Sequence, residues 1–303
     1  MRINKLPIAQ RAHVLTLLCK GMSMWAVERA ADASFPAIDK LLKDAGAACQ
    51  EFHGRTVRGV RSQRVQCDEI WSFVHAKRKN VPTAKAAPEG AGDVWMRTAL
   101  DADRKLILSW KVGSRDAEYA PALMDDRRGR LANKVQLAPD GHKACLQAVE
   151  DACGADIDYA MLVKLYGEPP ASPEAARRCS PSECVGARKE TITGKPDPKH
   201  ISTSCTERAN LTMRMSMRRF ARLTNAFSKR IENHCHQLAL CFVFCNFVRI
   251  RKTLRMTPAM SAGISDRLWS MEDIVALIDA REAPTNRRGP YQPRQPKAAE
   301  IQN

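Results

Sequence analysis

The chain has 303 residues, of which 44% are hydrophobic, and its 49 Lys and Arg against 33 Asp and Glu give a net charge of +16. This apolar fraction is ordinary for a folded protein and excludes wholesale disorder. The longest apolar run, Gln237 to Val248, is too short to span a bilayer. The positive charge favours a polyanionic partner, nucleic acid before a membrane surface. Because no signal-peptide pattern is visible, we expect a cytoplasmic protein of bacterial type, associated with the nucleoid.

The eleven cysteines are odd in number and irregularly spaced, and most of them lie in apolar segments. In a cytoplasmic chain this pattern predicts reduced, packed thiols and no disulfide framework. A zinc site is the alternative, built from Cys179 and Cys184 or from His234, Cys235 and His236. Neither group has the paired CxxC arms that are typical of such a site.

Residues 1–50 are predicted to form an all-α domain of three short helices. Gly21 is a helix stop, and Ser23 and Ser34 are typical N-caps of the second and third helices. Two helices joined by a tight turn, with Lys40 and Lys43 on the outer face of the last one, are typical of a DNA-binding helix-turn-helix. A plain three-helix bundle is the alternative, and the basic charge of the chain favours DNA binding.

Residues 51–63 are rich in arginine and are predicted to be a basic linker. The stretch from Arg64 to Val74 follows, and its β-branched and aromatic residues predict a strand. Because successive side chains of a strand point to opposite faces, Asp68 and Glu69 cannot serve the same site. A carboxylate in so apolar a strand is costly unless solvent, a partner or a metal compensates for it. We expect a metal, with its other ligands supplied from elsewhere in the chain.

The next segments predict more of a sheet. Two strands, Val94 to Leu100 and Lys105 to Val112, are expected to form a hairpin in which Asp101 and Asp103 are turn formers. The remaining expected elements are a helix over 118–131, a strand over 134–138, a helix over 142–153, a strand over 159–165 and, at about 167–200, an insertion with little regular structure.

Asp140 follows the strand 134–138 after Pro139, at the carboxyl end where α/β sheets place their ligands. Its neighbours Pro139 and Gly141 also make an ordinary turn. The position is therefore a candidate site and, by itself, a weak signal.

A helix is predicted from Thr206 to about Ile231. At 100° per residue, Asn210, Arg214 and Arg218 fall within about 60° of Glu207, while apolar side chains fall on the far side. A solvated charged face is the alternative, but it does not account for a lone acid at the head of a row of arginines. We therefore expect a carboxylate followed by a surface for phosphates.

The C-terminal part is predicted to contain a buried helix, Asn233 to Leu254, which ends in a basic cluster of Arg249, Arg251 and Lys252. Residues 261–283 carry a last amphipathic helix, Met271 to Arg281. Residues 284–303 are predicted to be a disordered basic tail.

Three stretches, at 67–73, 139–144 and 206–214, resemble the three motif blocks of bacterial insertion-sequence transposases, specifically the "insertion sequence one" family. A fourth, at 246–258, resembles the end of that family's catalytic domain. The resemblance covers about residues 1–280. It implies an α/β fold, a ribonuclease H-like mixed sheet with helices on both faces. This catalytic domain would span residues 64–260 and follow the all-α helix-turn-helix domain.

The resemblance also implies an Asp-Asp-Glu triad, Asp68, Asp140 and Glu207, that holds two Mg²⁺ ions, for which Mn²⁺ can substitute. Such a site suits in-line displacement at phosphorus, because hard cations with carboxylate ligands stabilise both the entering and the leaving oxygen. The implied activity is binding of terminal inverted repeats, cleavage at the element end, and attack of the freed 3′-hydroxyl on target DNA.

The implied partners are double-stranded DNA, both element ends and target, and further copies of the chain in an active homo-oligomer. Residues expected to contact DNA are Lys40, Lys43, Asn210, Arg214, Arg218, Arg249, Arg251 and Lys252; such phosphate contacts position a duplex and make binding weaken with salt.

The sequence departs from the family pattern at several positions. Arg251 stands where a histidine is expected, Cys145, Cys205, Cys241 and Cys245 stand where aromatic residues are expected, and Trp25 stands where a smaller or charged residue is expected. These departures suit an alternative, a decayed transposase that only binds specific DNA. A third hypothesis is a ribonuclease H-like nuclease without strand transfer.

Overall fold

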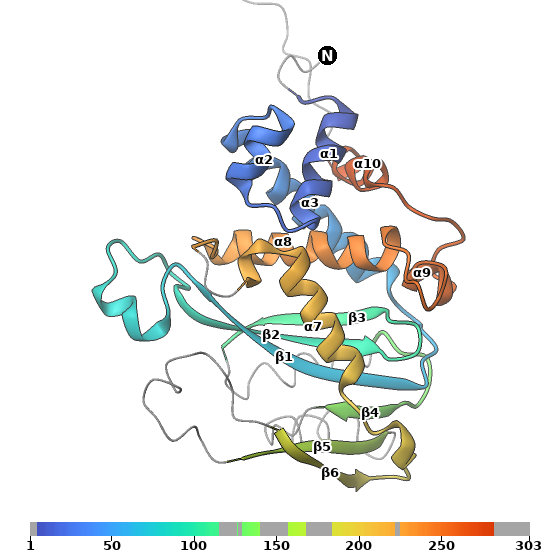
Figure 1. Cartoon of the computed structure of the whole chain (residues 1–303). Coiled ribbons are helices and arrows are strands. Elements are labelled where there is room, and N and C mark those ends of the chain that lie inside the picture. Colours follow the sequence, from blue (N-terminus) through green and yellow to red (C-terminus); the bar gives the residue numbers. More distant parts are fainter. Residues whose placement is uncertain are drawn as a thin grey trace, which may run out of the picture.

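The computed structural model describes residues 5–114, 126, 129–139, 157–167, 184–221 and 225–281. Its centre is a six-stranded sheet of order β3-β2-β1-β4-β5-β6 (Figure 1). The strands are β1 (Arg64–Val74), β2 (Gly92–Asp101), β3 (Ile107–Gly113), β4 (Gln136–Pro139), β5 (Asp158–Tyr166) and β6 (Cys184–Thr193).

The sheet is mixed. Strands β1, β2 and β3 form an antiparallel meander, β4 and β5 run parallel to β1, and β6 runs antiparallel to β5. Strand β1 lies between β2 and β4, and Val65, Cys67 and Ile70 are buried in it, as its apolar sequence predicts. This topology is ribonuclease H-like, which confirms the predicted α/β fold class.

The helices on one face are α7 (Ser204–Ser216), the 3₁₀ turn η3 (Arg218–Phe220), α8 (Ile231–Val243) and the π-helical turn η4 (Phe244–Val248) (Figure 1). On the opposite face, Asp126, which is helical, accepts a hydrogen bond from the Ser109 hydroxyl of β3. Ser109 directly precedes Trp110, whose ring meets Phe242 of α8 at 4.9 Å, so the two side chains point to opposite faces.

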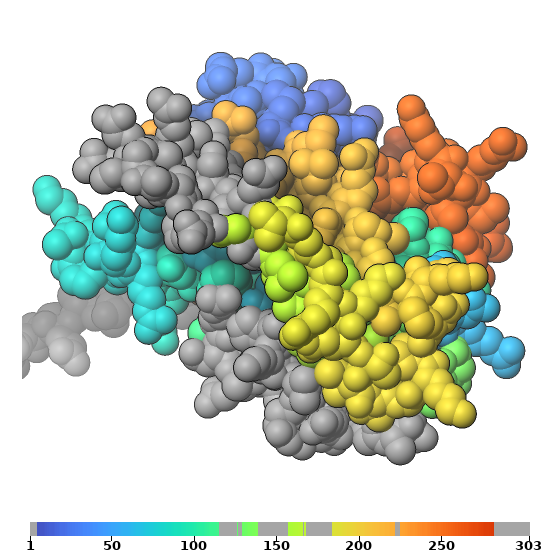
Figure 2. All heavy atoms as spheres, turned by 60° about the horizontal axis from the view of Figure 1, so that its bottom comes forward, coloured from blue at the N-terminus to red at the C-terminus, as the bar shows by residue number. Residues whose placement is uncertain are grey.

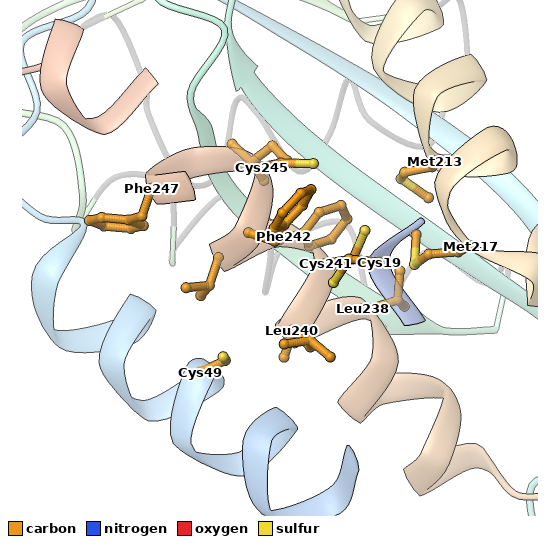
Figure 3. Close-up of a cluster of buried hydrophobic side chains, with 14 of the residues drawn as sticks. Cys19, Cys49, Met213, Met217, Leu238, Leu240, Cys241, Phe242, Cys245 and Phe247 are labelled. Carbon is orange, nitrogen blue, oxygen red and sulfur yellow. The ribbon is translucent and has the colours of Figure 1, made fainter. Parts of the chain in front are cut away.

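The N-terminal helices are α1 (Ile8–Cys19), α2 (Met24–Ala31) and α3 (Phe35–Thr56). They pack directly on the sheet-covering helices. Gly46 of α3 lies so close to α8 that an added Cβ would stand 2.3 Å from the His236 Cβ. Figure 3 shows the core beneath this crossing, where Cys49 of α3 and Cys19 of α1 face Leu240 and Cys241 of α8.

The remaining described helices are η1 (Arg78–Thr83), η2 (Pro198–His200), α9 (Pro258–Ser261) and α10 (Met271–Arg281). Helix α10 packs on α1, where Arg11 pairs with Asp279 at 2.8 Å. Its predicted start is confirmed, because the Ser270 hydroxyl accepts from the Glu272 amide. Within the described ranges no helix is both long and apolar enough to cross a membrane.

The basic linker predicted at 51–63 is partly wrong, because α3 continues through Thr56. The additional turns of α3 bury aromatic side chains against the rest of the protein. Phe52 meets Phe247 at 5.0 Å between ring centroids, and His53 meets Trp110 at 4.6 Å. These contacts extend the helix into a stretch whose arginines suggested a linker.

The single helix predicted from Thr206 to Ile231 is also wrong. Helix α7 ends at Ser216, where Met217 adopts extended backbone angles (φ −127°, ψ 109°). The turn brings Phe220 to 5.0 Å from the His234 ring and lets Arg219 donate to the Ser228 hydroxyl. Tertiary packing of this kind outweighs local helix propensity.

The predicted insertion and the predicted C-terminal buried helix are both partly wrong. The insertion at 167–200 contains β6, whose side chains are mostly exposed, so it lacks the alternating apolar pattern that reveals a strand. The buried helix expected to run to Leu254 ends earlier, after η4. The Asn246 side chain there bonds both the amide and the carbonyl of Ile107 in β3, at 3.0 and 2.9 Å.

Candidate active-site face

Strand β1 holds Asp68 on the face covered by α7. The Asp68 Oδ2 atom accepts a hydrogen bond from the Asn210 side chain of α7 at 2.8 Å. Two residues earlier in β1, on the same face, the Gln66 Oε1 atom accepts from the backbone amides of Cys205 and Thr206 at 2.9 and 3.2 Å. The first turn of α7 is thereby capped by the strand that carries Asp68.

Glu207 lies between these two attachment points. It follows Thr206 directly and precedes Asn210 by three residues, which is about 4.5 Å along a helix axis. Its Oε1 atom accepts from the Thr203 hydroxyl at 2.8 Å and lies 2.5 Å from the Lys164 ammonium of β5. The structure therefore brings Asp68 and Glu207 to the same face of the sheet.

The Lys164 hydrogen bond is the main cause that holds the pKa of Glu207 below its ordinary value. Burial acts in the opposite direction, and the Thr203 hydroxyl adds to the lowering. Glu207 is consequently an anion at neutral pH, as a ligand for a hard cation must be. An ammonium group already neutralises it.

Asp140 lies outside the described residues. Its predecessor Pro139 is the last residue of β4 and is the register partner of Cys67, which directly precedes Asp68. The order β1-β4-β5 also places β4 between the strand of Asp68 and the strand of Lys164.

Glu69 points to the other face, as alternation along a strand predicts. It pairs with Arg97 of β2, its direct register partner, at 2.6 Å between Arg97 Nε and Glu69 Oε1. Both side chains are largely buried, at 4% and 15% exposure. The pair is structural, and Asp68 is the residue that faces α7.

The predicted DNA-contacting residues near this face are Asn210, Arg214 and Arg251. Asn210 and Arg251 line one small cavity, and their Oδ1 and Nε atoms are buried without a hydrogen-bond partner in the described part of the chain. Arg214 follows Glu207 by two helical turns and is half-buried. Asn210 and Arg251 therefore lie together, and Arg214 follows Asn210 by about one helical turn.

Arg218 does not belong to it. Because α7 ends at Ser216, Arg218 lies in η3 and lines a separate cavity next to Lys43. The alignment of Arg218 with Glu207 that a continuous helix predicts is therefore wrong. Arg249 and Lys252 follow η4, and Lys252 is exposed.

The outer face of α3 is less basic than the sequence suggested. Lys40 pairs with Asp44 and Lys43 pairs with Asp39, each at 2.5 Å and each four residues apart on the helix. Lys40 is 73% exposed, whereas Lys43 lies at the edge of the α3–α8 contact, where Asn233 also donates to Asp39. Lys40 thus remains the more accessible of the two.

The oxygen atoms on this face suit a hard divalent cation. Asp68 and Glu207 supply carboxylates, and Asn210 supplies a buried amide oxygen that has no hydrogen-bond partner among the described residues. Among the residues that the structure describes, no three His, Cys, Asp or Glu side chains gather into a metal site. His234 of the alternative zinc site is buried between Ser72 and Ser228, and burial lowers its pKa to about 3.

Sequence reasoning missed Gln66, which caps α7, and Lys164, which pairs with Glu207. A signal for Gln66 existed, because it lies two residues before Asp68 and so shares its strand face. No local pattern marks Lys164, since its partner lies 43 residues later in the chain.

The chain matches no protein-family model. Nor does any curated protein sequence match it. Among the similar solved structures is the simian T-cell lymphotropic virus intasome in complex with PP2A regulatory subunit B56 gamma, with a TM-score of 0.38 and 11% identity over 94% of this chain and 80% of that one. The piggyBac transposase synaptic complex with hairpin DNA has a TM-score of 0.37 and 10% identity over 94% of this chain and 74% of that one. The mariner Mos1 paired end complex with Mg has a TM-score of 0.19 and 17% identity over 50% of this chain and 58% of that one. Because these scores are below 0.5, the assignment of the fold rests on the sheet topology.

Proposed function

We propose that this protein is a transposase of a bacterial insertion sequence. It binds the terminal inverted repeats and performs Mg²⁺-dependent strand cleavage and strand transfer through Asp68, Asp140 and Glu207. The observation that carries the proposal is the attachment of α7 to β1 through Gln66 and Asp68, at positions of the helix on either side of Glu207. A carboxylate from a central strand and one from a late helix lie on the same face of a ribonuclease H-like sheet.

The third proposed carboxylate, Asp140, is assigned from its position in the sequence after β4. Asp140 is joined to Pro139, whose neighbour across the parallel ladder is Cys67. Asp68 directly follows Cys67 and Asp140 directly follows Pro139, and from this register we infer that Asp140 completes the site next to Asp68. The carboxylate oxygens of the three side chains and the amide oxygen of Asn210 would hold the divalent ions, which when bound stabilise charge on the entering and leaving oxygens of a phosphodiester.

The protein's own residues have two further roles in this proposal. Gln66 fixes the first turn of α7 and thereby the position of Glu207. Arg214 and Arg251 hold the DNA backbone next to the carboxylates, since guanidinium groups match phosphate geometry. Lys40 on α3 contacts the duplex of the inverted repeat, and the net charge of +16 provides general attraction.

The experiment uses full-length protein and linear DNA that carries the sequences flanking its gene. Cleavage is measured with Mg²⁺ and with EDTA, and DNA binding is measured in parallel. Asp68→Asn, Asp140→Asn and Glu207→Gln should each abolish cleavage and leave binding within about twofold. Glu272→Gln is the matched control for Glu207→Gln, because Glu272 is also an exposed glutamate in the first turn of a helix. Cleavage by all three variants would refute the proposal.

DNA binding without cleavage is the second candidate function. The observation that favours it is the ion pair between Lys164 and Glu207, which neutralises a proposed metal ligand. A decayed transposase of this kind would bind the same ends with and without Mg²⁺ and would cut neither. The cleavage measurement above separates the two functions directly.

A further inference from the structure

A second, larger cavity lies away from the carboxylates. It has a volume of about 460 Å³ and opens between the turn that joins α1 to α2, the start of α3, η3, and residues 225–230, which precede α8. Gly21 in that turn approaches α7 so closely that an added Cβ would lie 2.6 Å from the Met215 carbonyl oxygen. The N-terminal helices are therefore held against α7 at this edge, and the volume is that of a site for one small ligand.

The walls of the cavity carry an excess of positive charge. Asp39 is the acid among the lining residues. Five basic side chains line the cavity with it: Lys43, Arg218, Arg219, Lys229 and Arg230. Asp39 already accepts from Asn233 at 2.8 Å and pairs with Lys43. The other cations are left to attract an anionic ligand.

Arg219 is the most informative of these cations. It is largely buried, and its two terminal nitrogens contact the Ser228 hydroxyl at 3.0 Å and the Met24 sulfur at 3.5 Å. Burial lowers its pKa to about 10, with Asp39 acting in the opposite direction, so it stays charged at neutral pH. A buried guanidinium whose hydrogen-bond partners within the described ranges are neutral favours a bound anion, and phosphate matches its fork of donors.

Aromatic rings stand beside these cations. Trp25 is 61% exposed, and its ring lies 4.7 Å from that of Phe35 in a tilted stack. Phe227 lines the same cavity, with the Lys229 ammonium 3.8 Å from its ring centroid. An exposed indole next to basic side chains is a platform on which an unstacked base can lie.

We propose that this cavity binds one unpaired nucleotide of DNA, with its base on Trp25 and its phosphate at Arg218 and Arg219. The base must be unpaired and unstacked, because inside a duplex both of its faces are covered by neighbouring bases. The cavity is also far too small for a duplex. The inference rests on the proposed function only in taking DNA as the substrate.

The test is a binding measurement with the full-length chain in EDTA, so that no cleavage occurs. The probes are a short, labelled single strand of thymidines and a blunt duplex of the same length. Trp25→Ala should weaken binding of the single strand by roughly tenfold, the scale for loss of one stacked base. It should leave duplex binding within about twofold, and Trp25→Phe should restore most of the loss.

Arg218→Ala should also weaken single-strand binding and reduce its salt dependence by about one phosphate contact. Arg188→Ala is the matched control, because Arg188 is an exposed arginine on β6. Strand β6 lies at the sheet edge away from the N-terminal helices (Figure 1). Unchanged single-strand binding by both Trp25→Ala and Arg218→Ala would overturn the inference. An equal loss for single strand and duplex would overturn it as well and would indicate a duplex contact.

The two proposals fail in different ways. If neither Trp25→Ala nor Arg218→Ala weakens single-strand binding while the wild type still cuts DNA with Mg²⁺, the inference about the cavity fails and the proposed function stands. If the triad variants cut normally while Trp25→Ala loses the single strand, the proposed function fails and the cavity remains a nucleotide site. A chain that binds neither probe contradicts both.

Discussion

The contact between α3 and α8 predicts opposite effects for the same substitution at two positions of one helix. In Gly46→Ala the new Cβ would lie 2.3 Å from the His236 Cβ, 2.4 Å from its Cα and 2.7 Å from its carbonyl oxygen. Ordinary carbon contacts are about 3.5–4.0 Å. All three atoms are fixed to the backbone of α8, so the helices must separate.

Overpacking of this kind costs about 1–3 kcal/mol, and replacing glycine in a helix by alanine returns roughly 0.5–1 kcal/mol. We therefore expect Gly46→Ala to be destabilised by about 1–2 kcal/mol. At Gly54, also in α3, an added Cβ meets no atom within 4 Å. Gly54→Ala should be neutral or up to about 1 kcal/mol more stable.

Urea unfolding of the two variants and the wild type measures both effects. The midpoint should fall for Gly46→Ala and stay level or rise for Gly54→Ala, at an unchanged slope. The result matters for function, because α3 carries Lys40 and would present it to DNA from a fixed position. Equal stability of the two variants would show that α3 does not cross α8 at Gly46.

Three further substitutions test the candidate face and its surroundings. Lys164→Met should raise the pKa of Glu207 toward its ordinary value. A lowered carboxyl pKa stabilises the fold above the unfolded-state pKa, and this stabilisation is lost as pH falls through the folded-state pKa. The variant should therefore lose up to about 1 kcal/mol of unfolding free energy at neutral pH and nothing in strong acid, which unfolding at both pH values measures. Glu69→Gln should cost roughly 3 kcal/mol in thermal denaturation, since it leaves the Arg97 guanidinium buried without its carboxylate. Gln66→Leu should cost about 1 kcal/mol through loss of the cap on α7 and should lower cleavage more than DNA binding.

Control variants and pH dependence distinguish these effects from general destabilisation. Glu190→Gln, on the exposed strand β6, should change stability by less than about 0.5 kcal/mol. An equally small effect of Glu69→Gln would show that burial does not make the Glu69–Arg97 pair costly to break. A stability loss in Lys164→Met that persists in strong acid would indicate packing and not charge. Gln66→Leu with normal cleavage would mean that the cap does not position Glu207.

The strands were predictable because their side-chain patterns are local. β1, the β2–β3 hairpin, β4 and β5 all lie where apolar runs and turn residues indicate them. The Asp101 carboxylate accepts the amides of Asp103 and Arg104 at 2.8 Å, as expected of a turn former. The opposite orientations of Asp68 and Glu69 likewise follow from alternation alone.

What sequence could not supply depends on contacts between distant segments. Strand β6 forms because β5 offers an edge, although Val185 is exposed and its neighbours show no buried pattern. The segment of β6 lies on the surface in Figure 2. Helix α7 stops at Ser216 because Phe220 and Arg219 find partners in and near α8. The cavity around Trp25 is assembled from three such segments, so no single stretch of sequence indicates it.

The most direct test of the central claim is a titration of full-length protein with Mn²⁺, in which electron paramagnetic resonance measures the free ion. If Asp68, Asp140 and Glu207 form one site, the wild type should bind two ions. Asp68→Asn, Asp140→Asn and Glu207→Gln should each weaken that binding tenfold or more, while Glu272→Gln should not. Binding of two ions by all three variants with wild-type affinity would contradict the account.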